Sequence, residues 1–271
     1  MKEEEAYSIL DIISESDGQS VILTRSGSIC IPFELRQPEC YSLSPEEIDE
    51  RDGMYREAFR HMPDGTYVHK QDVFLKKEYH PGKGTGSFLD RADARHFEGR
   101  LYIDHTCILH FVLAGLKSLE KAYVSSPLAY KEHLHREDYR KLEAFLEGVD
   151  NAVSILQNMR GNSVLPMSCE EISGFTRAYS GLFGDTDAVV DIHVDGSLHV
   201  GKNHARCYAV CDETFLPEGN IESYVRDESL PPAASQLYHP LMEQLGMYLP
   251  YNHIVNQVIY FEGNERDRKS V

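Results

Sequence analysis

The chain has 271 residues, and its 27 lysines and arginines against 44 aspartates and glutamates give a formal net charge of −17. A surface this acidic repels phosphate backbones, which argues against direct nucleic-acid binding. With 16 Tyr and 11 Phe, the chain has too many aromatics for a disordered protein. The amino end, Met1–Glu5, is acidic where a secretory signal is basic, and the longest nearly apolar stretch, 108–116, is well short of the about 20 residues of a membrane-spanning helix. The composition predicts a soluble protein of the cytoplasm.

In the first half of the chain, strand patterns alternate with helix patterns. Arg25-Ser26-Gly27 separates two β-rich runs and predicts a hairpin loop. Ser44-Pro45-Glu46-Glu47 is a capping box with proline at the first helical position, so it predicts a helix start. The elements expected here are strands 20–24 and 28–35, a helix from Ser44 to Met62, a strand 66–76, a loop 80–87, a helix 88–97 and a strand 101–113.

The second half mixes helices and hairpins in the same way. The elements expected here are a helix 139–156, a helix from Ser168 to Gly181 or Gly184, strands 188–194, 197–200 and 205–212, a loop 212–235, a helix 240–246 and a strand 253–261. This order predicts an α+β fold with mixed or antiparallel sheets and packed amphipathic helices, in two subdomains. The stretch 115–136 lacks periodicity and is expected to be a linker or mobile excursion between subdomains 1–114 and 137–271.

No stretch of the sequence matches G-x-x-x-x-G-K-[ST], the loop whose amides and lysine cradle nucleotide phosphates. The glycines of Gly82–Gly86 have the wrong spacing and no strand directly before them. ATP hydrolysis by the P-loop route is therefore not expected. The sequence predicts no catalytic residue, no cofactor and no metal site.

Histidines gather around Asp195-Gly196, a hairpin signal. A two-residue turn there pairs His193 with Leu198, which puts His193 and His199 on opposite faces, where they cannot share an ion. A three-residue loop would reverse that result. The expectation is structural histidines; the alternative is a stand-alone metal-dependent hydrolase that uses His193, His199 and His204.

The six cysteines are expected to be free thiols, because a chain of this length without an export signal does not need disulfides. Cys207 and Cys211, four residues apart in an expected strand, are interpreted as core thiols. Cys107 and His105 share a strand face, but a nucleophilic pair needs direct contact and an electropositive pocket. No catalytic role is assigned to them.

Three stretches together resemble the TraG proteins of conjugative transposons in Bacteroides-type bacteria. Asp64–Phe74, with Val68-His69-Lys70-Gln71-Asp72, resembles that family's "hydrophobic-Val-His-Lys-Gln-Asp-x-Phe" strand. Ser87–Arg91, His96-Phe97 and Ile103–Cys107 resemble the block that follows it, and Tyr251–Gln257 resembles its "Asn-His-x-x-Asn-Gln" strand. The order and spacing also agree, so the resemblance covers essentially the whole chain. The glycine loop 80–86 has no counterpart in that pattern.

The resemblance implies a function. TraG proteins are similar to the VirB-type ATPases that energise type IV secretion and conjugative DNA transfer, in which a P-loop motor follows an amino-terminal region like this one. The chain is then expected to be an amino-terminal piece of a longer protein, and ATP and Mg²⁺ are expected only in the motor. Its implied role is docking and oligomerisation at the inner membrane, with other secretion subunits and the motor domain as partners. The alternative is an independent cytoplasmic adaptor.

Two polar groups in these motifs form the candidate interaction surface. They are His69, Lys70, Gln71 and Asp72 in the first motif, and Asn252, His253, Asn256 and Gln257 in the third. A polar run of this kind either protects an exposed or edge strand, or contacts the motor or another subunit. A buried polar network is a further alternative for the second group.

Overall fold

The structure is a computed structural model. It describes residues 9–14, 19–38, 44–81, 87–116, 136–184, 192–210, 225–226, 238–239, 249 and 251–261. Several expected features lie outside these residues: the glycines of 82–86, most of the linker 115–136, most of the strand 188–194, most of the loop 212–235, the helix 240–246 and the polar end 262–271.

The centre of the described fold is an antiparallel sheet of seven strands in the order β1-β2-β3-β5-β4-β12, with β6 paired to β3 off this path. Its strands are β1 (Ile9–Ser14), β2 (Ser20–Thr24), β3 (Ile29–Arg36), β4 (Thr66–Glu78), β5 (Leu101–Leu113), β6 (Ser163–Pro166) and β12 (His253–Phe261). Two smaller sheets hold β7 (Ile192–Val194), β8 (Leu198–Val200) and β9 (Asn203–Ala205), and β10 (Val225–Arg226) and β11 (Tyr238–His239). The chain thus has the predicted α+β fold.

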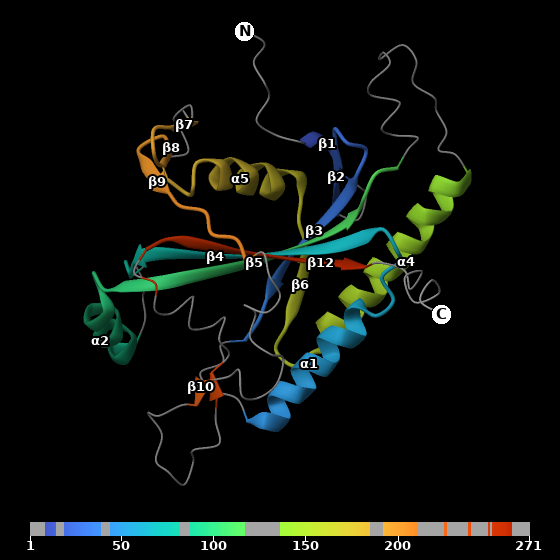
Figure 1. The fold of residues 1–271 in the computed structure, drawn as a ribbon. Coiled ribbons are helices and arrows are strands. Elements are labelled where there is room, and N and C mark those ends of the chain that lie inside the picture. The colour runs from blue at the N-terminus through green and yellow to red at the C-terminus, as the bar shows by residue number, and fades with distance from the viewer. Residues whose placement is uncertain are drawn as a thin grey trace.

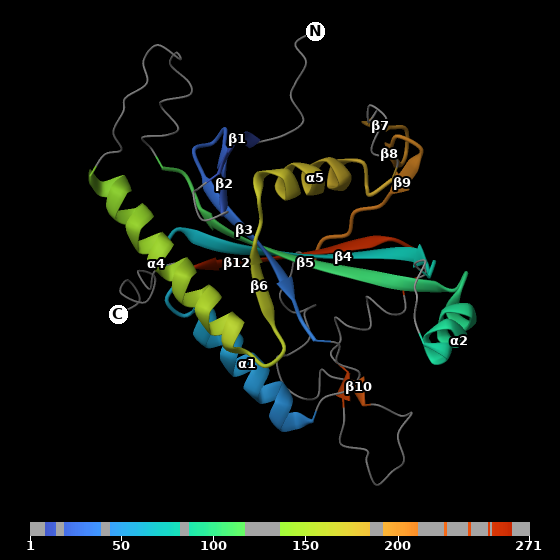
Figure 2. The ribbon, with the colours of Figure 1, turned by 180° about the vertical axis from the view of Figure 1, so that it is seen from behind.

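The helices of the described residues are α1 (Pro45–Phe59), α2 (Phe88–Phe97), α4 (Arg136–Asn158) and α5 (Cys169–Ser180). α1 and α4 lie on one side of the sheet, whereas α5 and the β7–β9 sheet lie on the other (Figures 1 and 2). The predicted capping boxes are present: Ser44 and Glu47 cap α1, and Ser168 and Glu171 cap α5. α2 lies at the far tip of the long β4–β5 pair.

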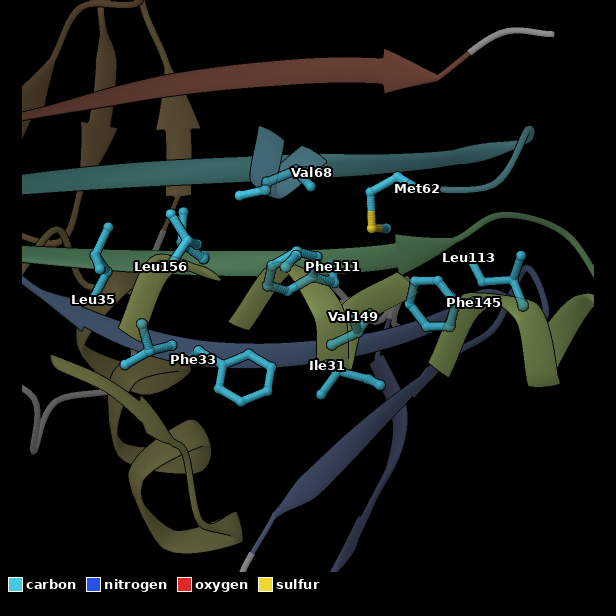
Figure 3. Close-up of a cluster of buried hydrophobic side chains, with 14 of the residues drawn as sticks. Ile31, Phe33, Leu35, Met62, Val68, Phe111, Leu113, Phe145, Val149 and Leu156 are labelled. Atoms are coloured by element: carbon cyan, nitrogen blue, oxygen red, sulfur yellow. The ribbon is translucent and has the colours of Figure 1, made fainter. Parts of the chain in front are cut away.

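The main core fills the space between the sheet and α1 and α4 (Figure 3). Phe111 of β5 and Phe145 of α4 are completely buried there, and the Phe33 ring meets Phe111 edge to face at 5.8 Å. Gly148 lets α4 approach the end of α1 closely, because a Cβ at this position would lie 3.3 Å from the carbonyl oxygen of His61. A second cluster, which includes Ile172 of α5, covers the opposite face.

The predicted division at residues 115–136 does not separate two sheets or two cores. β6 and β12 come from the second half of the sequence, yet they pair with β3 and β4 of the first half. The main core likewise combines side chains from both halves. The subdomains 1–114 and 137–271 are therefore not independent folding units, because neither contains a complete set of strands for the central sheet.

Sequence reasoning also missed four strands and extended one too far. These strands are β1, β6, β10 and β11. The last three have only four, two and two residues, whereas the six residues of β1 were not recognised as a strand. Residues 206–210 form no strand, although 205–212 was expected to be one, and Cys207 is exposed rather than part of a core. Among the described helices, none is both long and apolar enough to cross a membrane.

Candidate functional site

The two polar motifs, far apart in the sequence, lie side by side in the sheet. β12 pairs with β4 so that Asn256 is opposite Gln71 and Gln257 is opposite Lys70. β4 lies between β5 and β12 (Figures 1 and 2), so it is not an edge strand and the edge-protection explanation for its polar run is wrong. Successive residues of a strand point to opposite faces, so the run His69–Asp72 supplies two separate clusters.

The cluster on the α5 side is a chain of hydrogen bonds that includes no carboxylate, lysine or arginine. Asn256 Oδ1 lies 2.9 Å from His69 Nε2 and accepts a 2.9 Å hydrogen bond from Gln71 Nε2. Gln71 Oε1 lies 2.7 Å from His110 Nε2, and His110 Nδ1 lies 3.6 Å from the Cys30 sulfur. These five residues are called the neutral network below. They join four neighbouring strands of the central sheet, β3, β5, β4 and β12.

The protonation states in the neutral network are mutually consistent. The Gln71 oxygen can only accept, so His110 donates from Nε2 and its Nδ1 accepts from the Cys30 thiol. Burial, together with repulsion from His69, lowers the pKa of His110 to about 3. Burial raises the pKa of Cys30 to about 12. Both groups are therefore uncharged at neutral pH, as a buried relay of neutral dipoles requires.

The cluster on the α1 and α4 side is ionic. Asp72 is buried, with an ion pair to Lys70 through one carboxylate oxygen and a 2.9 Å contact to His105 Nε2 through the other. Cys107 hydrogen-bonds to the same carboxylate. These four residues are called the charged network below. Burial opposes ionisation of Asp72, but the bonds and charges of His105 and Lys70 outweigh it and lower the pKa of the carboxyl.

A stack of three rings extends the charged network to β12. Phe74 lies between His105, at 4.5 Å and 13°, and His253, at 4.7 Å and 14°. His253 Nε2 is buried and has no hydrogen-bond partner among the described residues, whereas its Nδ1 lies 3.0 Å from the Tyr251 carbonyl oxygen. Asn252 anchors the start of the strand by accepting a 2.8 Å hydrogen bond from the Lys76 backbone amide.

The arrangement does not activate Cys107 for nucleophilic catalysis. Burial raises the pKa of this thiol to about 12, so the thiolate that attacks a substrate is not formed near neutral pH. His105 contacts Asp72 rather than the sulfur. Tyr55 of α1 is partly buried, and this burial raises the pKa of its hydroxyl to about 12. The ionisable side chains at this site hold one another in position by ion pairs and hydrogen bonds. The ring stack extends these contacts to His253, the first residue of β12.

Most of the eight predicted residues meet as internal partners. His69, Gln71 and Asn256 join the neutral network, Lys70 and Asp72 join the charged network, and Asn252 and His253 bind the neighbouring strand or rings. Gln257 lies opposite Lys70. Sequence reasoning missed His110 and Cys30, whose place in the neutral network depends on the pairing of β3 with β5.

The histidine hairpin has a three-residue loop, so the register predicted from a two-residue turn is wrong. Val194 pairs with Leu198 and His193 pairs with His199, which places both rings on one face, 4.7 Å apart and parallel within 2°. Gly196, with a φ of 92°, lies in the middle of this loop. Among the described residues, His193, Asp195 and His199 form the one group whose geometry suits a metal ion.

A near-match to the nucleotide-binding octet also lies in this hairpin. Gly196–Asn203 reads Gly-Ser-Leu-His-Val-Gly-Lys-Asn and departs from the octet only at its last residue. A P-loop follows a strand and opens a helix, which directs its amides at the phosphates. Here Gly201-Lys202 instead turns β8 into β9. The segment therefore lacks the helix that the motif requires.

No family model matches this chain, and no protein in the search of curated proteins matches it.

Proposed function

We propose that this chain is the non-catalytic docking and oligomerisation region of a conjugative-transfer ATPase of the VirB type. Its partners are further copies of the chain, other type IV secretion subunits and the motor domain, at the cytoplasmic side of the inner membrane. The residues of the TraG resemblance support this proposal, because its first and third motifs form one hydrogen-bonded unit of β4 and β12. The observation on which the proposal mainly rests is the open outer edge of β12.

β12 has none of the features that block an edge strand from pairing. Its nine residues, His253–Phe261, include no lysine, arginine, aspartate, glutamate, glycine or proline. Near its end, Val258, Ile259 and Tyr260 are 45%, 43% and 69% exposed. Among the described residues no strand pairs with its outer side. A long uncharged edge of this kind accepts a further strand through backbone hydrogen bonds.

The opposite edge of the sheet, β1, is protected. It has six residues, carries Asp11, and its pairing with β2 shifts register between Ile9 and Asp11. A charge and an irregular register both discourage strand addition. The two edges therefore differ in how readily they accept a further strand, and this difference supports β12 rather than β1 as the proposed site of self-association.

The two networks support docking indirectly. Asn256 in the neutral network, Asn252 at the start of the strand and the ring of His253 fix β12 in one register against β4. A strand with one register presents one pattern of amides and carbonyls to a partner. We infer that a second copy adds its own β12 antiparallel to the first, because a twofold pair satisfies both open edges at once.

Sedimentation velocity of the purified chain over a range of concentrations tests this association. We expect dimers or larger species, and we expect Ile259→Lys to shift the chain toward monomers, because an edge lysine opposes strand addition. Ile13→Lys on β1, where Ile13 is 49% exposed, is the matched control and should leave association unchanged. A chain that is monomeric throughout, or one that responds only to Ile13→Lys, contradicts the proposed oligomerisation.

ATP turnover tests the non-catalytic part of the proposal. The purified chain with Mg²⁺ is expected to release no phosphate above the buffer rate. Lys202→Ala is the useful companion variant, because Lys202 is the lysine of the near-match to the octet. ATP hydrolysis that disappears in Lys202→Ala would show that the hairpin binds a nucleotide, and it would contradict the non-catalytic docking role.

A further inference from the structure

We propose that the β7–β8 hairpin binds one zinc ion through His193, Asp195 and His199. The candidate ligand atoms of these three side chains all lie within 4.8 Å of one another. Zinc takes histidine nitrogens and carboxylate oxygens at about 2.0–2.2 Å, so its donors stand roughly 3.4 Å apart in a tetrahedral site. Small side-chain rotations therefore suffice to close the three donors around the ion.

The hairpin holds the donors on one face by its backbone. Pairing of His193 with His199 puts the two rings side by side, and the loop brings Asp195 back over them. Asp195 Oδ1 lies 2.6 Å from His199 Nε2, and Ser197 Oγ lies 2.9 Å from the same nitrogen. Zinc takes the place of the hydrogen between His199 and Asp195, and water fills the fourth position. The bound ion also displaces the contact of the Ser197 hydroxyl with His199 Nε2.

The neighbouring strand restrains the central ligand. His204 on β9 pairs with His199, and its ring meets the His199 ring at 4.2 Å and 62°. The His199 side chain is only 18% exposed as a result. Restraint of this kind positions a ligand before the metal arrives, which lowers the entropy lost on binding.

The chemistry of the donors favours zinc over Mg²⁺ and Ca²⁺. Two imidazoles and one carboxylate suit Zn²⁺, whereas Mg²⁺ and Ca²⁺ prefer oxygen ligands throughout. The role that fits is structural. The strands of this sheet have three residues each, and Ile192 and Val194 are exposed while Val200 is buried. So small a sheet gains little from its own burial, and metal binding supplies folding free energy directly.

Calorimetric titration of the chelator-treated full chain with Zn²⁺ tests the site. We expect one ion per chain, and a loss of at least about 100-fold in affinity in His193→Ala and in His199→Ala, beyond the 10–100-fold typical of residues that only support a ligand. His80→Ala is the control, since its side chain is 73% exposed and lies outside the hairpin. Absence of binding, or unchanged affinity in His199→Ala, overturns the proposal.

Two further measurements separate this site from adventitious binding. Zinc should slow amide-hydrogen exchange in residues 192–205 of the unmodified chain and leave it unchanged in His193→Ala, whether or not the variant alters the hairpin. Cys207→Ser should bind zinc like the unmodified chain, although Cys207 is an exposed free thiol nearby in sequence. Binding that disappears in Cys207→Ser overturns the ligand set. None of these results depends on association through β12.

Discussion

The neutral and charged networks show two ways to bury the same polar run. On the α5 side, His110 and Gln71 pass hydrogen bonds between uncharged groups, from the Cys30 thiol to Asn256. On the α1 and α4 side, the buried Asp72 keeps its charge because cationic and hydrogen-bonding partners surround it. Unpaired buried charges cost far more than unpaired dipoles, so the charged network has more to lose from a single substitution.

The largest effect is expected from Asp72→Ala, which leaves Lys70 without its partner and His105 without its acceptor. Breaking a buried ion pair from one side costs about 3–5 kcal/mol, and partial exposure of Lys70 places the expected loss near 3 kcal/mol. Urea denaturation measures it. Asp104→Ala is the control, because the Lys77–Asp104 pair is exposed and should contribute below about 1 kcal/mol. Equal losses in the two variants would show that Asp72 behaves as a surface group.

Acid should separate the two networks through His110. Folding lowers the pKa of this histidine from 6.5 to about 3. Between these two pH values the imidazole is therefore protonated in the unfolded chain but not in the folded chain. Its contribution to stability is complete above pH 6.5 and is lost as the pH falls toward 3, by at most about 1.4 kcal/mol per unit. At pH 5 the loss is about 2 kcal/mol. Denaturation at pH 7 and pH 5 should therefore show a shallower decline in His110→Gln.

The charged network predicts a different pH range. Folding lowers the pKa of Asp72 below its ordinary 3.8, so its stabilisation is present above that value and is lost at lower pH. Between pH 6.5 and 4 the neutral network alone should weaken. His96→Gln, on the exposed face of α2, is the control for loss of a histidine. A decline that is unchanged in His110→Gln, or equally reduced in His96→Gln, would place the acid sensitivity elsewhere.

An intermediate effect is expected in the neutral network from Asn256→Ala. The Asn256 oxygen contacts both His69 and Gln71, and loss of the acceptor of the buried Gln71 amide costs about 1–3 kcal/mol. We expect about 1.5 kcal/mol by urea denaturation. A double-mutant cycle with Gln71→Ala should give a coupling of roughly 0.5–1.5 kcal/mol. Additive losses in the cycle would mean that the contact does not connect β4 to β12.

Local sequence signals predicted most elements of this fold. Ser44-Pro45-Glu46-Glu47 and Ser168-Cys169-Glu170-Glu171 marked helix starts because the capping residues are adjacent in sequence. The alternation in 66–76 marked β4. The composition of the central sheet from both halves of the chain could not be predicted, because the pairing of β12 with β4 and of β6 with β3 depends on contacts between distant residues.

The sequence identified most residues of the candidate site, but it did not show which of them contact one another. His69–Asp72 and Asn252–Gln257 are recognisable as polar runs in strands. Neither run indicates that the two strands pair, because they are far apart in the sequence. The hairpin error has a more specific origin: Asp195-Gly196 fits a two-residue turn, and one additional loop residue reverses which face each histidine occupies. A one-residue difference in the loop thus separates an interpretation as structural histidines from a group of side chains whose geometry suits a metal ion.

The smallest effect is expected from Phe74→Leu, which removes the ring between His105 and His253 but keeps an apolar side chain. Stacked aromatic pairs contribute about 0.5–1.5 kcal/mol beyond the area they bury, so we expect a loss of about 1 kcal/mol in urea. Since this stack joins the charged network to the first residue of β12, amide exchange should also quicken near His253 and not near Phe261. Uniform quickening along β12 would indicate instead that Phe74 acts through the core as a whole.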